Sequence, residues 1–435
     1  MLMTVFWFIV VLGVLVFIHE LGHYLAARHV GVRVERFSIG FPPRAFGRKI
    51  GETEYVVSWV PLGGYVKLFG QNLDDEDPKD PANYAAKTKL QRLYILAAGP
   101  AFNLFAALLL MPLVYWLGVE QSGHRLEPPR IQEVRAESHA EAAGFRSGDV
   151  IISLNDAETA NWKSLYENLE RAVLSGGELS FVVRRTGGQG TEAQTRIAID
   201  AMLFASGKPI GWVPLIPPRV GRPSPDMPAY QAGIREGDRV LSIDGQAVEK
   251  WQDISPLVLQ GAGKAQRFTV QREGEVLSMD IAAQEADGER WLVGIYPYRY
   301  TEQHGFFESI GLGTKRLWEL TTGTFSFLGQ MLTGGGSLDA LGGPVKIGVV
   351  IGEAARNGFV DLIFLMSVIS LQLGIFNLLP IPALDGGHIT LLGVEWLNRR
   401  PLSPRLRERA QTIGFSLLIA LIVVVTYNDV LQLFS

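Results

Sequence analysis

The chain has 435 residues, of which 47% are hydrophobic and 19% are charged, below the roughly 25% of charged residues typical of soluble domains. Forty basic and 44 acidic side chains give a net charge of −4. This balance excludes a generally basic nucleic-acid binder, and we expect no nucleic-acid partner. Cysteine is absent, which excludes disulfide scaffolds, thiol nucleophiles and cysteine-ligated zinc. The composition favours a membrane protein whose chemistry comes from His, carboxylate or Ser residues.

Four apolar segments, at 1–27, 93–119, 360–384 and 412–434, are long enough to cross a hydrocarbon core of about 30 Å. A secretory signal peptide is the alternative interpretation of the first segment. That segment lacks a basic start, and the sequence His19-Glu20-Leu21-Gly22-His23 occupies the place of a cleavage site. We therefore predict four transmembrane spans.

Basic residues predict the orientation of these spans. The connectors 28–92 and 385–411 are rich in Lys and Arg, whereas the residues before the first span and after Tyr427 carry none. The positive-inside rule places both connectors in the cytoplasm and both termini outside. Residues 120–300 then lie in the periplasm of a bacterial cell. The Gly-rich, mildly amphipathic residues 301–359 are expected to form interfacial helices.

The segment between the second and third spans contains an internal repeat. Ala143-Gly144-Phe145-Arg146-Ser147-Gly148-Asp149 recurs 89 residues later as Ala232-Gly233-Ile234-Arg235-Glu236-Gly237-Asp238, and Trp162 and Trp251 share that offset. Two copies of this length predict tandem domains, at 120–205 and 206–300. The repeated turn and the strand after it resemble the core of bacterial PDZ domains, which implies a small α+β sandwich that can take a peptide by β-augmentation. The alternative is that one or both copies are spacers that bind no peptide.

The first span carries an H-E-x-x-H element. Residues i and i+4 share one face of a helix, so His19 and His23 can bind one metal ion while Glu20 lies beside them. A carboxylate between two imidazoles is costly within a span, which argues for a function. The alternative is a polar cluster that holds helices together.

A zinc site needs a further ligand, and without cysteine this must be a carboxylate or another His. The third apolar segment ends in Asn377-Leu-Leu-Pro-Ile-Pro-Ala-Leu-Asp385-Gly-Gly-His388. The first and third spans run in the same direction, so Asp385 can meet His19 and His23 at one depth. The prolines end the helix, and the glycines allow a tight reversal. His388 is expected to support this loop rather than to bind metal.

These two elements together resemble the site-2 protease family of intramembrane zinc metalloproteases, whose signatures are H-E-x-x-H and N-x-x-P-x-P-x-L-D-G. The resemblance covers essentially the whole chain, including four spans that enclose two PDZ-like domains. Residues 60–68 are similar to the family's membrane-associated β-hairpin, 98–103 to its second-span motif and 342–345 to the stretch before its third core span. Pro42 departs from the Gly-Phe-Gly-Pro sequence of many relatives.

The resemblance implies an α-helical polytopic membrane protein with four spans, a membrane-associated β-hairpin and two PDZ-like domains. It implies that zinc bound by the chain activates water for peptide hydrolysis. The implied residues are His19, His23 and Asp385 for the metal, Glu20 as general base, and Asn377, Gly63, Gly64 and Tyr65 for the substrate. Asn377 would alternatively bond a neighbouring helix, and the hairpin would alternatively be a simple interfacial turn.

The implied substrate is a single-span membrane protein that has already lost its outer domain, such as an anti-sigma factor or a signal-peptide remnant. The implied location is the bacterial cytoplasmic (inner) membrane, where the PDZ-like domains would filter substrates by size or bind new C-termini. Two other functions are consistent with parts of the sequence. A membrane-anchored PDZ scaffold or chaperone would not need Glu20 or Asp385, and an ion translocator would need more polar residues than Asn103 and Asp429 in the second and fourth spans.

Overall fold

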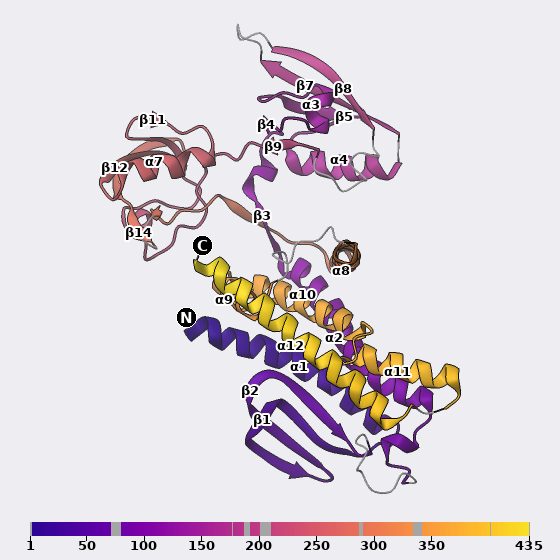
Figure 1. Ribbon diagram of the computed structural model, residues 1–435. Coiled ribbons are helices and arrows are strands. Elements are labelled where there is room, and N and C mark those ends of the chain that lie inside the picture. The colour runs from indigo at the N-terminus through magenta and orange to yellow at the C-terminus, as the bar shows by residue number, and fades with distance from the viewer. Residues whose placement is uncertain are drawn as a thin grey trace. The chain divides into compact units, whose positions relative to one another are not determined.

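The computed structural model describes residues 2–70, 80–175, 177–186, 192–200, 210–286, 290–333, 342–400 and 402–434. The chain divides into two compact units (Figure 1). The first unit combines Met1–Val119 with Gln303–Ser435, and the second comprises Glu120–Glu302. The two ends of the sequence therefore fold together, and the repeat-containing segment forms a body of its own.

The first unit is mainly helical. Its helices are α1 (Leu2–His29), α2 (Lys89–Leu117), α8 (Phe306–Leu332), α9 (Pro344–Asn357), α10 (Phe359–Leu378), α11 (Asp385–Asn398) and α12 (Pro404–Phe434). In the described part of the chain, four helices are long and apolar enough to cross a membrane, at Met3–His29, Lys89–Leu117, Phe359–Leu378 and Glu408–Asp429. The four predicted spans are thus present as helices.

The third of these helices is shorter than the apolar segment that predicted it. Helix α10 ends at Leu378, and Leu379 is extended, with φ −66° and ψ 148°. Pro380 follows, and a residue before proline is excluded from the helical region by steric contact with the ring. Residues 379–384 therefore form a non-helical connection rather than the last turns of a span.

Buried hydrogen bonds join α10 to α2. The Ser367 hydroxyl donates to the Ala107 carbonyl at 3.0 Å, and the Ser370 hydroxyl donates to the Asn103 carbonyl at 2.8 Å. Small residues allow such close approach of two helices where lipid gives little drive for association. The contact fixes α10, and hence the residues that follow it, against α2.

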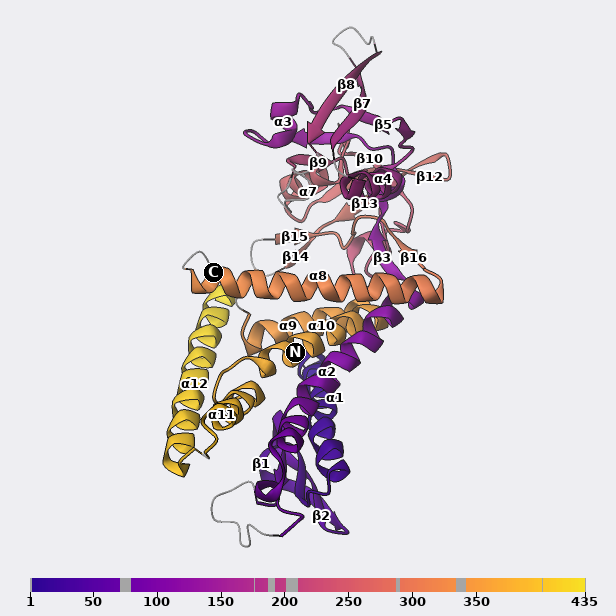
Figure 2. The same cartoon turned by 90° about the vertical axis from the view of Figure 1, so that its right-hand side faces the viewer.

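Helices α8 and α9 occupy the region 301–359. Figure 2 shows that α8 runs crosswise to α12 along the edge of the first unit. Leu317 of α8 is buried in a cluster with Met111 of α2, whereas Phe307 and Trp318 on α8 are 85% and 69% exposed. An amphipathic helix of this kind suits a membrane–water interface.

Strands β1 (Val34–Ile50) and β2 (Thr53–Leu68) are long, bent and folded back on each other. The first half of β1 pairs with both halves of β2, as at Ser38 with Tyr65 and with Val56, and the second half of β1 pairs with residues 53–58. The order across the sheet is 64–68, 34–39, 53–58 and 44–50. The predicted hairpin therefore folds into a single antiparallel sheet of four strand segments, with residues 64–68 at one edge.

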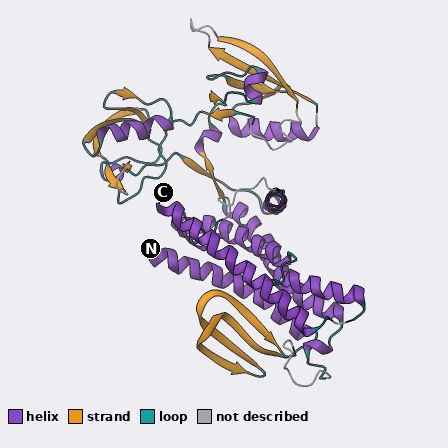
Figure 3. Ribbon diagram, viewed as in Figure 1, coloured by secondary structure: helices purple, strands orange, loops and turns teal. Residues whose placement is uncertain are grey.

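The second unit contains the repeat (Figure 3). Its first half has β4 (Ile131–Val134), α3 (His139–Ala143), β5 (Val150–Leu154), β6 (Ala157–Glu158), α4 (Trp162–Ser175), β7 (Glu178–Thr186), β8 (Glu192–Asp200) and β9 (Trp212–Pro214). Its second half has α6 (Pro228–Gln231), β10 (Arg239–Ile243), β11 (Gln246–Ala247), α7 (Ile254–Gly261), β12 (Ala265–Arg272) and β13 (Glu275–Ala282). Short strands β3 (Val119–Ser122), β14 (Gln284–Ala286), β15 (Arg290–Leu292) and β16 (Arg299–Glu302) complete the described elements.

The two halves have the same sheet topology and register. The strand orders are β6-β5-β7-β8 and β11-β10-β12-β13. Ser153 pairs with Val182 after a bulge, and Ser242, 89 residues later, pairs with Thr269 after a bulge at the same place. Strand β9 (Trp212–Pro214) pairs with β4, at the start of the first half. The long connection between β8 and β9 hides this pairing from a sequence comparison.

Each half contains the same buried ion pair. Arg185 binds both carboxylate oxygens of Asp149 at 2.7 Å and donates to the Gly144 carbonyl at 3.0 Å. Arg272 makes the same three bonds to Asp238 and to the Gly233 carbonyl. The aspartate of the repeated Gly-Asp turn is thus held by an arginine from the third strand of its sheet, a bidentate arrangement that fixes geometry strongly.

Candidate metal centre

Three side chains from two distant segments meet at one point of the first unit. His19 and His23 lie one turn apart on α1, and Asp385 is the first residue of α11. Asp385 Oδ2 is 3.1 Å from His19 Nε2 and 3.3 Å from His23 Nε2, and the two Nε2 atoms are 3.2 Å apart. Among the described residues, these three form the one His/Cys/Asp/Glu group with metal-binding geometry.

This geometry fits zinc. A metal ion that binds three corners of a tetrahedron at about 2.0–2.1 Å separates them by about 3.3–3.4 Å, close to the distances found. Asp385 Oδ2 is buried and has no hydrogen-bond partner in the described part of the chain. A cation held between three lone-pair-bearing atoms would satisfy all of them at once. The donor set of two imidazoles and one carboxylate is one that zinc uses in catalytic sites.

The second nitrogen of each imidazole is held by α2. His23 Nδ1 is 2.8 Å from the Ile95 carbonyl, so it donates its hydrogen there and leaves Nε2 free for a metal. His19 Nδ1 is 3.2 Å from the side-chain amide of Asn103, which is fully buried. Asn103 belongs to the family-like motif at 98–103, but the sequence alone assigns it no role at the site. It lies four residues after Gly99, on the same face of α2, which is the sequence feature that points to this role.

Close backbone approaches bring these segments together. A Cβ atom at Gly99 of α2 would lie 2.2 Å from His23 Nε2, so only glycine leaves room for the imidazole. A Cβ atom at Gly386 would lie 2.2 Å from the Leu379 carbonyl oxygen. The predicted tight reversal after Pro380 and Pro382 is therefore present, and it places Asp385 at the start of α11.

The edge of the β1–β2 sheet lies against Glu20. Glu20 is 8% exposed, and the Val66 backbone is within hydrogen-bonding reach of its carboxylate. A Cβ atom at Gly64 would lie 3.1 Å from Glu20 Cγ and 2.9 Å from Val16 Cγ1. The structure thus brings Gly64 next to the glutamate between the two histidines. Residues 64–68 form the sheet edge, whose outward backbone groups can pair with another strand.

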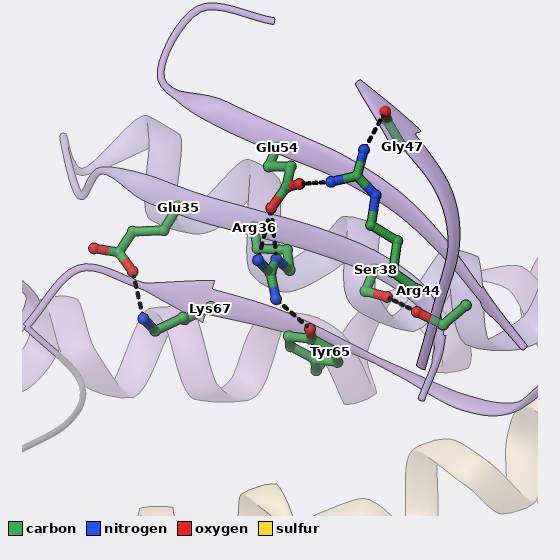
Figure 4. Close-up of polar contacts among 9 residues, drawn as sticks. Glu35, Arg36, Ser38, Arg44, Gly47, Glu54, Tyr65 and Lys67 are labelled. Carbon is green, nitrogen blue, oxygen red and sulfur yellow. Dashed lines mark hydrogen bonds and ion pairs between the residues drawn. The ribbon is translucent and has the colours of Figure 1, made fainter. Parts of the chain in front are cut away.

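A line of polar side chains crosses this sheet (Figure 4). Arg36 donates to the Tyr65 hydroxyl at 3.2 Å and to Glu54 at 2.8 and 2.7 Å, and Arg44 binds the other oxygen of Glu54. The hydrogen bonds from Arg36 hold the pKa of Glu54 below its ordinary value. Tyr65, a predicted substrate-binding residue, is therefore tied through Arg36 to the centre of the sheet.

The remaining candidates have different surroundings. Asn377 is half-buried near the end of α10, and its side-chain amide has no hydrogen-bond partner among the described residues. A Cβ atom at Gly63 would meet the Phe41 ring at 2.3 Å, so Gly63 packs against the bend of β1. His388 lines a cavity of about 370 Å³ with Pro382 and Phe415, and it is not part of the metal-binding group.

Comparison with known proteins agrees with this geometry. The sequence pattern described as Peptidase family M50 matches residues 7–421. The chain belongs to this family. This chain is 34% identical to the regulator of sigma-E protease RseP of Escherichia coli (strain K12), with 97% of each chain covered.

Two further relatives of this M50 peptidase cover almost their whole length. Protease RseP of Yersinia pestis is 32% identical over 98% of this chain and 99% of its own. A protein of Neisseria meningitidis that is named as a zinc metalloprotease is 31% identical over 99% of both chains. The chain is therefore an intramembrane zinc metalloprotease of the site-2 protease family, as the sequence predicted.

Proposed function

We propose that this protease hydrolyses a peptide bond within the transmembrane segment of a single-span protein already trimmed on its outer side. The substrate would be an anti-sigma factor or a signal-peptide remnant in the bacterial cytoplasmic membrane. The convergence of His19, His23 and Asp385 beside the buried Glu20 carries the proposal. The similarity to proteases named as regulators of sigma-E supports the substrate class.

His19, His23 and Asp385 would hold zinc, which when bound polarises a carbonyl and lowers the pKa of water. Glu20 would take the proton of the attacking water and return it to the leaving amine, which completes hydrolysis with one water consumed. Burial of Glu20 keeps bulk water away from that proton transfer. The Val66 backbone would orient the Glu20 carboxylate for it.

A transmembrane helix hides its carbonyl groups in internal hydrogen bonds and must unwind before attack. We infer that the unwound segment adds a strand to residues 64–68, at the sheet edge beside Glu20. Asn377, which has no hydrogen-bond partner among the described residues, would bind the freed substrate backbone. Gly63, Gly64 and Tyr65 would then shape the strand that receives the substrate.

The second unit would consist of two PDZ-like domains on the periplasmic side, with both chain termini on that side as well. The equal topology and register of its two sheets support a tandem pair, with the first domain extending to Pro214 rather than to residue 205. These domains would filter substrates by size or bind the C-termini of trimmed ones. A reporter that keeps a folded outer domain should then be cut more slowly than its trimmed form, and a free C-terminal peptide should slow cutting only if the C-terminus is bound.

The experiment that tests catalysis uses the purified full chain in vesicles with a single-span reporter. Wild type should contain one zinc per chain and cut within the apolar segment. Glu20→Gln should keep the zinc but lose activity by about 10²–10⁴-fold, the usual contribution of a general base. Asp385→Asn should lose zinc and activity together. Wild-type cleavage by Glu20→Gln would exclude this mechanism, and peptide binding that persists without any cleavage would favour a scaffold.

A further inference from the structure

A groove of about 470 Å³ lies between α1 and the outer part of the β1–β2 sheet. Phe17 of α1 forms one wall, and the sheet contributes Phe37, Ile39, Phe46 and Val57, with Arg48 and Tyr55 also lining it. Phe46 is 66% exposed. The groove is therefore an open apolar channel beside a membrane-spanning helix, and none of the three metal-site residues lines it.

The groove is apolar at one end and basic at the other. The sheet register places Phe46 across from Val57 and Ile39, and Arg48 across from Tyr55 and Phe37. Tyr55 lies towards the end of α1, because its hydroxyl is 2.7 Å from that of Tyr24. The groove therefore runs from apolar side chains towards the polar end of the helix.

Two arginines lie at that polar end. Arg48 lines the groove. Arg28 lies one turn of α1 beyond Tyr24, whose hydroxyl is 2.7 Å from that of Tyr55. Both side chains are exposed, and neither has an ion-pair partner among the described residues. Arg44 of the same strand, in contrast, is bound to Glu54. The polar end of the groove thus has one guanidinium group on its wall and a second on the adjacent turn of α1.

We propose that the groove binds an anionic phospholipid of the surrounding bilayer, with an acyl chain along Phe17, Phe46 and Val57 and its phosphate between Arg28 and Arg48. An acyl chain supplies the dispersion contacts that an empty apolar channel would forfeit. Guanidinium groups bind phosphate through paired hydrogen bonds. A zwitterionic headgroup brings its own ammonium to the same place, which weakens its attraction to two arginines.

The position of the groove distinguishes it from the substrate site. The strand at Glu20 comprises residues 64–68, whereas the outer wall of the groove, at residues 46–48, is three strands away in the sheet. The inner wall includes Phe37 and Ile39, on the strand next to that edge. At about 4.8 Å per strand, the separation of the outer wall from the edge is about 14 Å. A lipid headgroup at Arg48 would therefore lie away from Glu20 and leave the sheet edge open.

The test is native mass spectrometry of the full chain exposed to equal amounts of phosphatidylglycerol and phosphatidylethanolamine. Wild type should retain one phosphatidylglycerol with about tenfold preference, and Arg48→Gln should reduce that preference at least fivefold. Lys49→Gln is the matched control. It also removes one positive charge, but from the residue next to Arg48. The Lys49 side chain points to the face of the sheet opposite to that of Arg48, where it lies across from Glu54. Equal retention of the two lipids by wild type, or equal losses in both variants, would overturn the proposal.

A second variant tests the apolar part. Val57→Trp fills the channel and leaves both arginines in place, so it should lower phosphatidylglycerol retention while zinc content, the measure of correct folding, stays at one per chain. Unchanged retention with zinc intact would exclude the acyl chain from the groove. Displacement of the lipid by a single-span reporter, one for one, would show instead that the groove holds substrate.

Discussion

The side-chain amide of Asn103 lies 3.2 Å from Nδ1 of His19, and its Oδ1 atom is buried without a hydrogen-bond partner. When Nε2 of a neutral histidine binds a metal, Nδ1 carries the hydrogen and requires an acceptor. A 180° flip of the Asn103 side-chain amide exchanges Nδ2 for Oδ1 at that position. Oδ1 then accepts the hydrogen of His19 Nδ1, so both atoms have a hydrogen-bond partner. Asn103 is thus placed to fix the tautomer and orientation of His19.

Asn103→Ala should therefore weaken zinc binding by about 10–100-fold, the usual effect of losing a partner of a ligating histidine. Competition with a chelator measures this directly, before any activity assay. Ser367→Ala is the control, because it removes a buried hydrogen bond from α10 to α2, the helix that carries Asn103, without touching a metal ligand. Equal zinc affinities in Asn103→Ala and wild type would contradict the assignment.

The contact between Gly64 and Glu20 predicts the result of a small substitution. Gly64→Ala adds a Cβ atom 2.8 Å from the Ser38 carbonyl oxygen and 3.1 Å from Glu20 Cγ, so the sheet edge must move away from α1. A displacement near 1 Å costs catalysis up to about 10²-fold, and we expect a loss of at least tenfold with zinc content unchanged. Gly13→Ala, which meets nothing within 4 Å, should cut the reporter at the wild-type rate. Equal cleavage rates for Gly64→Ala and Gly13→Ala would show that catalysis does not depend on the position of the sheet edge at Gly64.

The repeated ion pair predicts a local stability effect in the second unit. Arg185→Leu leaves the fully buried Asp149 carboxylate without its partner, which should cost about 3 kcal/mol or more. Hydrogen exchange of β5 and β7 in the full chain measures the loss. Arg267→Leu breaks an ion pair to Asp280 in which both side chains are exposed, and it should change exchange little. Similar protection in both variants would mean that the buried pair contributes no more than a surface pair.

Asp429 near the end of α12 is 3% exposed and accepts hydrogen bonds from the Gly343 and Lys346 backbones, at 3.0 and 2.9 Å. A carboxylate at the start of α9 satisfies free N–H groups and the helix dipole, worth about 1–2 kcal/mol. Asp429→Leu should therefore loosen α12 from α9.

The absence of native cysteine makes the measurement simple. Val425→Cys places a thiol at a side chain that is 7% exposed, so it should react slowly with a maleimide and much faster when Asp429→Leu is added. Val424→Cys, at a position that is 50% exposed, should react with the maleimide at the same rate whether or not Asp429→Leu is present. An unchanged rate at position 425 would show that Asp429 does not hold the helix.

The sequence determined the features that depend on spacing along the chain. Four apolar lengths predicted four helices, the i and i+4 histidines predicted a shared ligand face, and the lack of cysteine restricted the third ligand to a carboxylate or His. The 89-residue repeat likewise predicted two units of one topology, since register follows local pattern.

Only the tertiary structure decided which distant groups lie in contact. The approach of Gly99 to His23, the support of His19 by Asn103, and the edge strand against Glu20 join segments up to 84 residues apart through packing that no periodicity records. The pairing of β9 with β4 and the end of α10 at Leu378 were not predicted from the sequence for the same reason. Spacing along the chain specifies which side chains share a face, whereas the packing of helices and strands specifies what each face meets.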